Sequence, residues 1–373
     1  MKRYQEKLIL KDLKQKLVLL VGPRQSGKTW LAKELAKQFN NSVYLNYDSQ
    51  ADRKIIQDES WLNDVDLLIF DELHKMPDWK NYLKGVYDTK TANLKILVTG
   101  SARLDSYDHM GDSLAGRYFR HRLLPLSLSE LKQTKQETNL NKLLQFGGFP
   151  EPYLSGDLKE AARWRLQYTN SLLSTDVFEF DQIQNIKSLQ LLFHLLKDRV
   201  GSPVSYQSLS EDLSIAPTTV KKYIEILEAL FIIFRVTPFS NNIARSILKE
   251  PKIYFFDSAM IENNEGAKLE NLVAISLLKY CYAMEDYEAQ EYKLHYLRTK
   301  DGQEVDFALA NNTEIQSIIE VKSSQTQVDK SLINFHKRYG PKAIQLVRSL
   351  RTDFQAADIE VLNLEKFLSN LQY

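Results

Sequence analysis

The chain has little cysteine and no excess charge of either sign. Its 373 residues include one cysteine, Cys281, which excludes an internal disulfide framework and a zinc site built from cysteines. The 49 basic residues are balanced by 48 acidic ones, so any nucleic-acid surface would be a local patch and not a global positive field. The length predicts two to four domains, and a hydrophobic fraction of 43% is enough for their cores.

Long apolar runs are also missing. No run approaches the length that crosses a bilayer, and residues 1–6 lack the apolar centre of a signal peptide. The sequence has no internal repeat and no long low-complexity linker. We therefore expect a cytoplasmic protein, without a membrane partner, whose domains pack against each other.

A glycine-rich loop between a predicted strand and a predicted helix is the strongest signal. Residues 17–21 are apolar, the pattern Gly-x-x-x-x-Gly-Lys-Thr follows, and apolar residues then recur at helical spacing. The glycines let backbone amides point at phosphate oxygens, which makes a turn that binds nothing the weaker interpretation. We expect Lys28 to reach the β- and γ-phosphates of ATP and Thr29 to hold Mg²⁺. The predicted nucleotide-binding residues are Gly22, Pro23, Arg24, Gln25, Ser26, Gly27, Lys28, Thr29 and Trp30.

A second apolar run ends in two carboxylates. Residues 67–70 are apolar and lead directly into Asp71 and Glu72, as in a strand that is buried on both faces of a parallel sheet. The carboxyl end of this strand would bring Asp71 to the Mg²⁺ shell and Glu72 to the attacking water. An acidic strand end at the surface is the alternative, and the preceding phosphate loop makes it the weaker one.

Two further residues are candidates for the same site. Ser101 follows the predicted strand 94–99 and can sense the γ-phosphate, a role compatible with capping a helix. Arg117 lies downstream and can supply positive charge to a transferring phosphoryl group, in cis or from a neighbouring subunit. A surface salt bridge is an equally good interpretation of Arg117. A role in a neighbouring subunit would require a homo-oligomer, which stays open.

The order of these motifs resembles a known family. The chain carries, in sequence, Gly-Pro-Arg-Gln-Ser-Gly-Lys-Thr, Phe-Asp-Glu-Leu-His-Lys, Val-Thr-Gly-Ser-Ala, Leu-Ala-Gly-Arg and Gly-Gly-Phe-Pro-Glu. This order is similar to that of prokaryotic AAA+-type ATPases of the archaeal branch related to signal-transduction ATPases. The resemblance implies an ATP hydrolase with a helical lid and a C-terminal domain similar to restriction endonucleases. Trp30 departs from the small residue or threonine expected there, which leaves the phosphate contacts intact.

The middle of the chain has a different pattern. Residues 127–199 are rich in helical periodicity and resemble the lid of such ATPases. Residues 200–256 predict two short helices followed by two strands, which is typical of a winged helix-turn-helix. The second helix could enter a DNA groove, or the module could serve packing alone. Packing is slightly favoured, because two lysines and two threonines on its outer side make a weak phosphate-binding stripe.

The last part of the chain has its own set of charged residues. Strand periodicity places Glu320 and Lys322 on one face, Asp306 on the neighbouring predicted strand can join them, and Glu270 lies on an upstream helix. This pattern resembles the site of PD-(D/E)xK nucleases. Asp306 and Glu320 would hold Mg²⁺, Lys322 would assist the water or stabilise charge on the phosphate, and Glu270 would support the metal. A strand with exposed charges, or a nuclease fold that has lost activity, stay open.

The sequence therefore predicts an α/β protein of four domains. They are a P-loop AAA+-type parallel-sheet domain in 1–126, a helical lid in 127–199, a winged helix-turn-helix in 200–256 and a PD-(D/E)xK nuclease-like domain in 257–373. The preferred function is an ATPase whose nucleotide state controls a C-terminal module directed at DNA or RNA, with Mg²⁺-dependent cleavage left open. One alternative is a signal-transduction-type ATP switch that binds a protein partner on an inactive nuclease-like scaffold. A remodelling ATPase that works as a ring is the other.

Overall fold

The chain folds into two compact units. The computed structural model describes residues 2–61, 64–100, 114–134, 138–174, 176–179, 183, 185–240, 249–262, 264–311 and 314–372. The first unit comprises residues 1–125 with 229–231, and the second comprises 126–228 with 232–373. The finer division into four domains stays a prediction. Every helix in the described part of the chain is too short or too polar to cross a bilayer.

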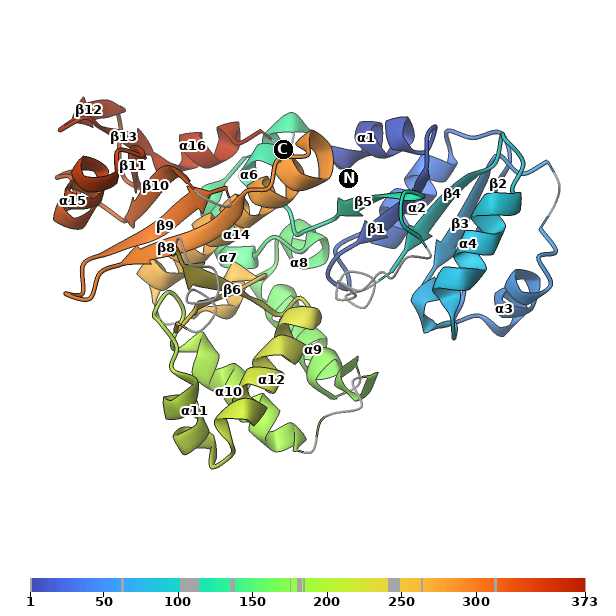
Figure 1. Cartoon of the computed structure of the whole chain (residues 1–373), viewed down its shortest axis with the longest axis horizontal. Helices are drawn as coiled ribbons and strands as arrows, with labels where there is room; N and C mark the ends of the chain where they lie inside the picture. The colour runs from blue at the N-terminus through green and yellow to red at the C-terminus, as the bar shows by residue number, and fades with distance from the viewer. Residues whose placement is uncertain are drawn as a thin grey trace. The chain divides into compact units, whose positions relative to one another are not determined.

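The first unit is built on a five-stranded sheet in the order β2-β3-β4-β1-β5 (Figure 1). Its strands are β1 (Leu17–Val21), β2 (Ser42–Asn46), β3 (Leu67–Asp71), β4 (Lys95–Thr99) and β5 (Tyr118–Arg122). Each strand runs parallel to its neighbours. The predicted α/β architecture with a parallel P-loop sheet is therefore confirmed.

Alternating side chains of the central strands form a core on each face of this sheet. Leu17 and Leu19 join one cluster of buried apolar residues, whereas Val18 and Leu20 join the other. Because both faces of β1 and β3 are covered, every residue of these two strands is buried. The helices of this unit are α1 (Gln5–Asp12), α2 (Lys28–Ala36), α3 (Gln50–Gln57) and α4 (Trp79–Thr89), with a short 3₁₀ helix at Leu73–Lys75.

Three neighbouring strands of the first unit end at the same edge of the sheet. Val21 ends β1, Thr99 ends β4 and Asp71 ends β3, and Asp71 lies directly opposite Thr99 in the register. Parallel strands bring their carboxyl ends together, and ligands of open α/β sheets bind at that edge. The predicted phosphate loop and the predicted metal-binding carboxylate therefore meet there.

The second unit begins with helices and continues into an eight-stranded sheet. The helices before the sheet are α6 (Leu128–Gln133), α7 (Leu140–Phe146), α8 (Pro150–Ser155), α9 (Leu158–Ser174), α10 (Ile186–Lys197), α11 (Tyr206–Leu213) and α12 (Pro217–Ala229). A 3₁₀ helix at Asp176–Glu179 follows α9, and another at Ser258–Met260 precedes α14 (Glu265–Glu288). The last helices are α15 (Lys330–Tyr339) and α16 (Leu364–Asn370).

The strand order in the second sheet is β12-β13-β11-β10-β9-β8-β6-β7. The strands are β6 (Ile233–Pro238), β7 (Lys252–Phe255), β8 (Lys293–Arg298), β9 (Glu304–Ala310), β10 (Ile315–Lys322), β11 (Lys342–Val347), β12 (Phe354–Ala356) and β13 (Ile359–Asn363). β6 pairs antiparallel with β7 and parallel with β8. The two strands predicted as a wing thus share one sheet with the strands of the predicted nuclease-like domain. Winged helix and nuclease fold both stay predictions.

Candidate functional site

The loop between β1 and α2 is curled tightly. Gly22, Gln25 and Gly27 have positive φ values of 147°, 61° and 98°. A Cβ on Gly22 would lie 2.4 Å from the carbonyl oxygen of Leu123, so only glycine fits this close backbone approach. The curl that the sequence predicts from its glycines is present.

The start of α2 presents polar groups to this loop. The Leu31 amide donates to the carbonyl oxygen of Gly27 at 2.9 Å, so the amides before it have no acceptor within the helix. The Ser26 hydroxyl is buried and finds no hydrogen-bond partner within the described residues. Free amides at the positive end of a helix are the groups that bind phosphate.

Lys28 is buried inside the loop. Its ammonium donates to the carbonyl oxygens of Gly22 at 2.9 Å and Pro23 at 2.7 Å. Burial lowers the pKa of Lys28 to about 8, although the nearby carboxylates of Glu72 and Asp71 oppose the shift. The cation predicted to meet the phosphates is therefore held inside the glycine-rich loop.

Asp71 is the acceptor on which three elements converge. Its Oδ2 accepts from Thr29 Oγ1 of α2 at 2.9 Å and from the Tyr44 hydroxyl of β2 at 2.5 Å. Its Oδ1 accepts from the Thr99 hydroxyl of β4. Burial and the bond to Asp71 raise the pKa of Tyr44, which keeps that hydroxyl protonated as a donor. The carboxylate is thus fixed in orientation beside Thr29.

Glu72 lies in the left-handed region, with φ at 57°. Its carboxylate lies 3.6 Å from His74 Nε2 and 3.7 Å from Lys75 Nζ, and Lys75 also contacts Asp48 at 2.6 Å. Burial raises the pKa of Glu72 above its ordinary value. A strained conformation for a non-glycine residue is frequent at functional sites. Glu72 thus has partners different from those of Asp71, although the two residues are adjacent in the chain.

The residues at this edge fit Mg²⁺ and a nucleotide. The hydroxyl of Thr29 and the carboxylate of Asp71 are oxygen ligands, the type that Mg²⁺ prefers, and they lie 2.9 Å apart. The unpartnered Ser26 hydroxyl and the cradle closed by Gly22 fit a phosphate chain.

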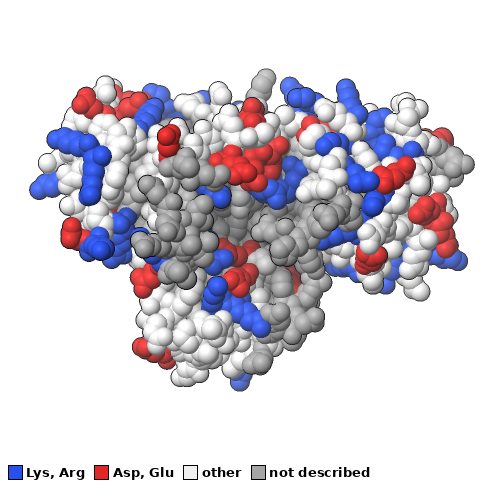
Figure 2. Space-filling model, in the orientation of Figure 1, with Lys and Arg blue, Asp and Glu red and all other residues white. Residues whose placement is uncertain are grey.

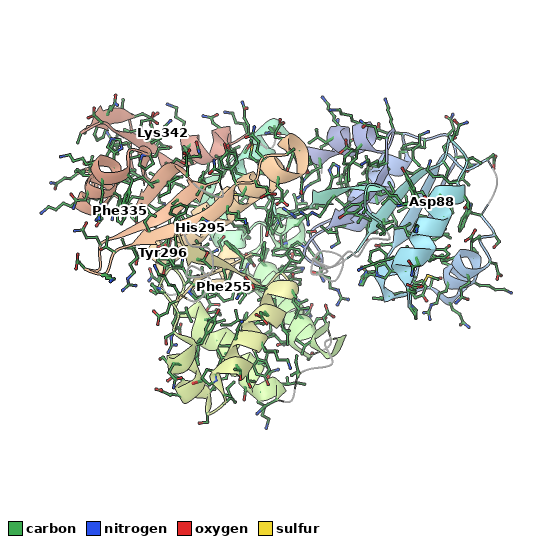
Figure 3. All side chains as sticks on the ribbon, viewed as in Figure 1. Asp88, Phe255, His295, Tyr296, Phe335 and Lys342 are labelled. Carbon is green, nitrogen blue, oxygen red and sulfur yellow. The ribbon has the colours of Figure 1, made fainter. Side chains whose placement is uncertain are left out.

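Other predicted residues of this site lie elsewhere. The backbone carbonyl of Arg117 accepts from the Leu17 amide at the start of β1, so Arg117 lies at the edge of the sheet opposite the phosphate loop. Its guanidinium forms a bidentate pair with Asp88 of α4 at 2.8 and 2.9 Å (Asp88 is labelled in Figure 3). The structure does not bring Arg117 to the loop of its own chain. Trp30 is 41% exposed on α2, and Ser101 lies outside the described residues.

Thr99 and Tyr44 were not predicted as part of this site. Thr99 ends the strand beside β3, and a polar residue at that position is the signal that could have found it. Tyr44 lies within β2, and only its hydrogen bond to Asp71 marks it. Thr99 reaches Asp71 because the two residues lie opposite each other at their strand ends, whereas Tyr44 reaches it from within the neighbouring strand β2.

The predicted C-terminal residues Asp306, Glu320 and Lys322 lie together across β9 and β10. The amide of Val321 donates to Asp306 Oδ2 at 2.9 Å, and the amide of Asp306 donates to Glu320 Oε2 at 3.3 Å. Lys322 Nζ contacts Glu320 Oε1 at 2.7 Å and Asp329 Oδ2 at 3.1 Å. Burial and the Asp306 charge raise the pKa of Glu320 to about 8.

Glu270 approaches this group from α14. The side chain of Asn271 receives a hydrogen bond from the Phe255 amide at 2.7 Å and donates one to its carbonyl at 2.8 Å, which fixes α14 against β7 (Phe255 is labelled in Figure 3). Glu270 accepts from the Tyr254 hydroxyl at 2.6 Å. Burial, with the nearby Asp306 charge, raises the pKa of Glu270 to about 7.

Lys252, which the sequence did not single out, lies among these carboxylates. Its Nζ is 2.7 Å from Glu304, 3.4 Å from Glu270 and 3.8 Å from Asp306. The parts of the chain that the structure describes contain no group of three or more His, Cys, Asp or Glu side chains placed to hold a metal ion. The predicted Mg²⁺ site of Glu270, Asp306 and Glu320 stays a prediction, and the ammonium of Lys252 already contacts two of its three carboxylates.

Three family models match successive parts of the chain. Residues 14–132 match a family model described as an AAA domain. This segment is an AAA-type P-loop ATPase domain. Residues 137–270 and 265–367 match two models, each described as a domain of unknown function. The AAA-type fold supports nucleotide binding, as the sequence predicts.

Relatives and solved structures are similar over most of the chain. An uncharacterized protein of Methanocaldococcus jannaschii is 25% identical over 81% of this chain and 75% of its own length. An uncharacterized protein of Mycobacterium tuberculosis is 26% identical over 67% of this chain, which spans only 56% of that protein. A Walker-type ATPase of Pyrococcus abyssi has a TM-score of 0.44 and 15% identity over 70% of this chain and 94% of its own. The Orc1 protein of Aeropyrum pernix, solved in complex with DNA, has a TM-score of 0.36 and 12% identity over 74% and 93%.

Proposed function

We propose that the AAA-type domain binds ATP with Mg²⁺ and hydrolyses it, and that its nucleotide state controls the second unit. The observation that carries the proposal is the convergence of Thr29, Thr99 and Tyr44 on Asp71 beside the phosphate loop. These four residues come from four separate elements, the helix α2 and the strands β2, β3 and β4. A surface strand end would not hold its carboxylate in this way.

Each residue has a distinct part in the proposal. The loop amides and Lys28 bind the phosphates, while Thr29 and Asp71 hold Mg²⁺. The metal neutralises charge on the phosphate oxygens when it is bound. Glu72 orients the attacking water and takes its proton, and its raised pKa makes it a stronger base than an exposed carboxylate.

Phosphate release with Mg²⁺ and ATP tests this proposal. We expect release by the parent protein and its loss in Asp71→Asn, because the substitution removes the charge that holds the metal. Glu34→Gln is a matched control, since Glu34 lies on the exposed side of α2 and pairs with Lys37. Phosphate release by Asp71→Asn at the rate of the parent protein would contradict the assignment of Asp71 as a metal ligand. If the parent protein binds Mg-ATP and never releases phosphate, hydrolysis is rejected and the nucleotide site acts only as a binding switch.

For the second unit we infer an inactive nuclease-like scaffold that binds a protein partner under control of the nucleotide. Lys252 supports this alternative over metal-dependent cleavage, because an ammonium lies among three of the carboxylates. Charge on the molecular surface agrees with it. Lys and Arg side chains lie interspersed with Asp and Glu on the face shown in Figure 2, whereas nucleic acid would favour a basic stripe.

Incubation with DNA and RNA forms in Mg²⁺ or Mn²⁺ tests the second part. We expect no strand cleavage by the parent protein. Cleavage that Glu320→Ala and Lys322→Ala both abolish, and that Lys342→Ala retains, would establish the predicted nuclease instead. Lys342 is a suitable control, because it lies on the neighbouring strand and pairs with Glu360 at 3.0 Å.

A further inference from the structure

One lysine of the second unit is buried in an acidic environment. Lys252 is the first residue of β7 and is 1% exposed. Its ammonium contacts the acidic cluster, by which we mean Glu270, Glu304 and Asp306, at distances between 2.7 and 3.8 Å. It also lies 5.4 Å from the ring centroid of Tyr296 on β8 (labelled in Figure 3). A buried charge is tolerated only when such partners surround it.

We propose that the ammonium of Lys252 is the resident cation of the acidic cluster and takes the place of a divalent metal ion there. The cluster then needs no Mg²⁺ or Mn²⁺ to remain folded and does not bind either ion. This deepens the proposed inactive scaffold and rests on that part of the proposed function. ATP hydrolysis by the first unit is independent of it.

The backbone of Lys252 is held on both sides. It lies opposite Val236 of β6 in the register, and it forms an isolated bridge with Pro203. β6 joins β8 through Thr237 and Pro238, which allows β7 to lie against α14 and its Glu270. These pairings hold the main chain of Lys252 beside the acidic cluster.

Lys252 also stays protonated. Burial, the largest single influence, lowers its pKa, but Glu270, Asp306 and Glu304 together outweigh burial and raise the pKa above its ordinary value. The ammonium therefore persists throughout the neutral range. It neutralises carboxylates that would otherwise repel each other.

The ammonium of Lys252 already contacts the carboxylate oxygens that a divalent ion would need. Mg²⁺ needs oxygens at about 2.0–2.1 Å and keeps several waters. The ammonium meets the same carboxylates, so an ion bound to them would face a like charge at short range. Gly201 closes the cluster further, because a Cβ on it would lie 2.9 Å from both carboxylate oxygens of Glu270.

Titration with Mn²⁺ alone, without nucleotide, tests the proposal on the full chain. Thr29→Ala serves as the background, since it removes the proposed metal ligand of the nucleotide site. The titration compares the Thr29→Ala protein with the double variant that also carries Asp306→Asn. We expect the paramagnetic resonance signal of free Mn²⁺ to rise along the same curve for both proteins. Mn²⁺ uptake by Thr29→Ala that Asp306→Asn abolishes would overturn the proposal.

A second pair of variants tests the role of the lysine itself. Lys252→Met in the same background keeps much of the side-chain volume and leaves the acidic cluster without its cation. We expect a lower thermal midpoint that Mn²⁺ raises again, together with Mn²⁺ uptake that Asp306→Asn removes. Lys279→Met is the matched control, because Lys279 is also buried and pairs with Glu130 at 2.7 Å outside the cluster. It should lose stability without gaining Mn²⁺ uptake.

The outcomes separate the proposals. A folded Lys252→Met protein that gains no Mn²⁺ uptake would contradict the assignment of Lys252 as a substitute cation. If Lys252→Met does not fold, the titration of the Thr29→Ala protein decides alone. Strand cleavage by the parent would reject the inactive scaffold, whereas Mn²⁺ uptake without cleavage would reject only the role of Lys252.

Discussion

The hydroxyl of Thr29 lies 2.9 Å from the carboxylate of Asp71, although 42 positions separate the two residues in the chain. Thr29 lies in the first turn of α2 and Asp71 ends β3, so this contact joins the glycine-rich motif to the acidic one. A metal that binds both residues would sit at the mouth of the phosphate loop. The site therefore consists of two local patterns that the parallel sheet brings together.

Lys28→Ala should weaken ATP binding while the fold remains. The carbonyl oxygens of Gly22 and Pro23 hold the ammonium inside the predicted phosphate loop. Loss of charge-assisted hydrogen bonds corresponds to about 10- to 100-fold in affinity. Titration of the protein with Mg-ATP measures the change, and Lys37→Ala at the exposed end of α2 is the control. Unchanged affinity in a folded Lys28→Ala protein would contradict the phosphate-loop assignment.

Thr99→Val should weaken Mg-ATP binding by about tenfold, because a lost hydrogen bond to a buried carboxylate costs roughly 1–2 kcal/mol. The Thr99 hydroxyl donates to Oδ1 of Asp71, and valine keeps the shape without the donor. Thr91→Val at an exposed position is the matched control. Equal affinities for the two variants would show that Asp71 does not depend on Thr99 for its orientation.

Gly22→Ala should destabilise the first unit. The residue has φ at 147°, and its Cβ would meet the Leu123 carbonyl oxygen at 2.4 Å, so the backbone must shift at a cost of about 1–3 kcal/mol. Gly85→Ala in α4 should stabilise by roughly 0.5–1 kcal/mol, because nothing lies within 4 Å of its Cβ. Urea unfolding of both variants provides the comparison. A Gly22→Ala protein as stable as the parent would show that the loop adapts freely.

Local motifs in the sequence predicted the first site well. The glycines, Lys28 and Thr29 belong to one short segment, and Asp71 and Glu72 end an apolar strand, so spacing alone indicates their chemistry. Thr99 required the strand order, which no local pattern contains. Arg117 was a candidate because it follows the sensor strand in sequence, but its place at the opposite edge of the sheet depends on the pairing of β5 with β1.

The second site shows a further limit of sequence patterns. Asp306, Glu320 and Lys322 lie on adjacent strands, and strand periodicity was enough to group them. Lys252 lies on β7, which is separated from β9 by β8 and β6 in the sheet order. Its approach to Glu270 depends on how β7 packs against α14, a tertiary arrangement that charge patterns along the chain do not encode.

Stability of the second unit should fall as the pH rises from about 4.5 to about 8. Glu320 has a pKa raised from 4.5 to about 8, so over this window the folded state binds more protons than the unfolded state. Stability present below the unfolded pKa is then lost as the pH rises through the folded pKa. Glu270 and Asp306 shift in the same direction, while Lys322 and Asp329 face Glu320 as an ion pair.

Unfolding midpoints measured across this pH range check that prediction. Glu320→Gln should show a smaller fall than the parent, because glutamine does not titrate. Glu360→Gln on β13, which β11 separates from β10, serves as a control, since Glu360 pairs with Lys342 near the surface. Equal pH dependence in the parent and Glu320→Gln would show that Glu320 does not titrate differently on folding.

Paired measurements of binding and turnover in Glu72→Gln test the central claim most directly. Asp71, Thr29 and Lys28 keep their contacts in this variant, so the affinity for Mg-ATP should stay within a few-fold of the parent. Turnover in a single round should fall by roughly a hundred- to ten-thousand-fold, because the general base is lost. Binding that fails together with turnover, or turnover at the parent rate, would contradict the account of a phosphate loop, a metal site and a separate base at one edge of the sheet.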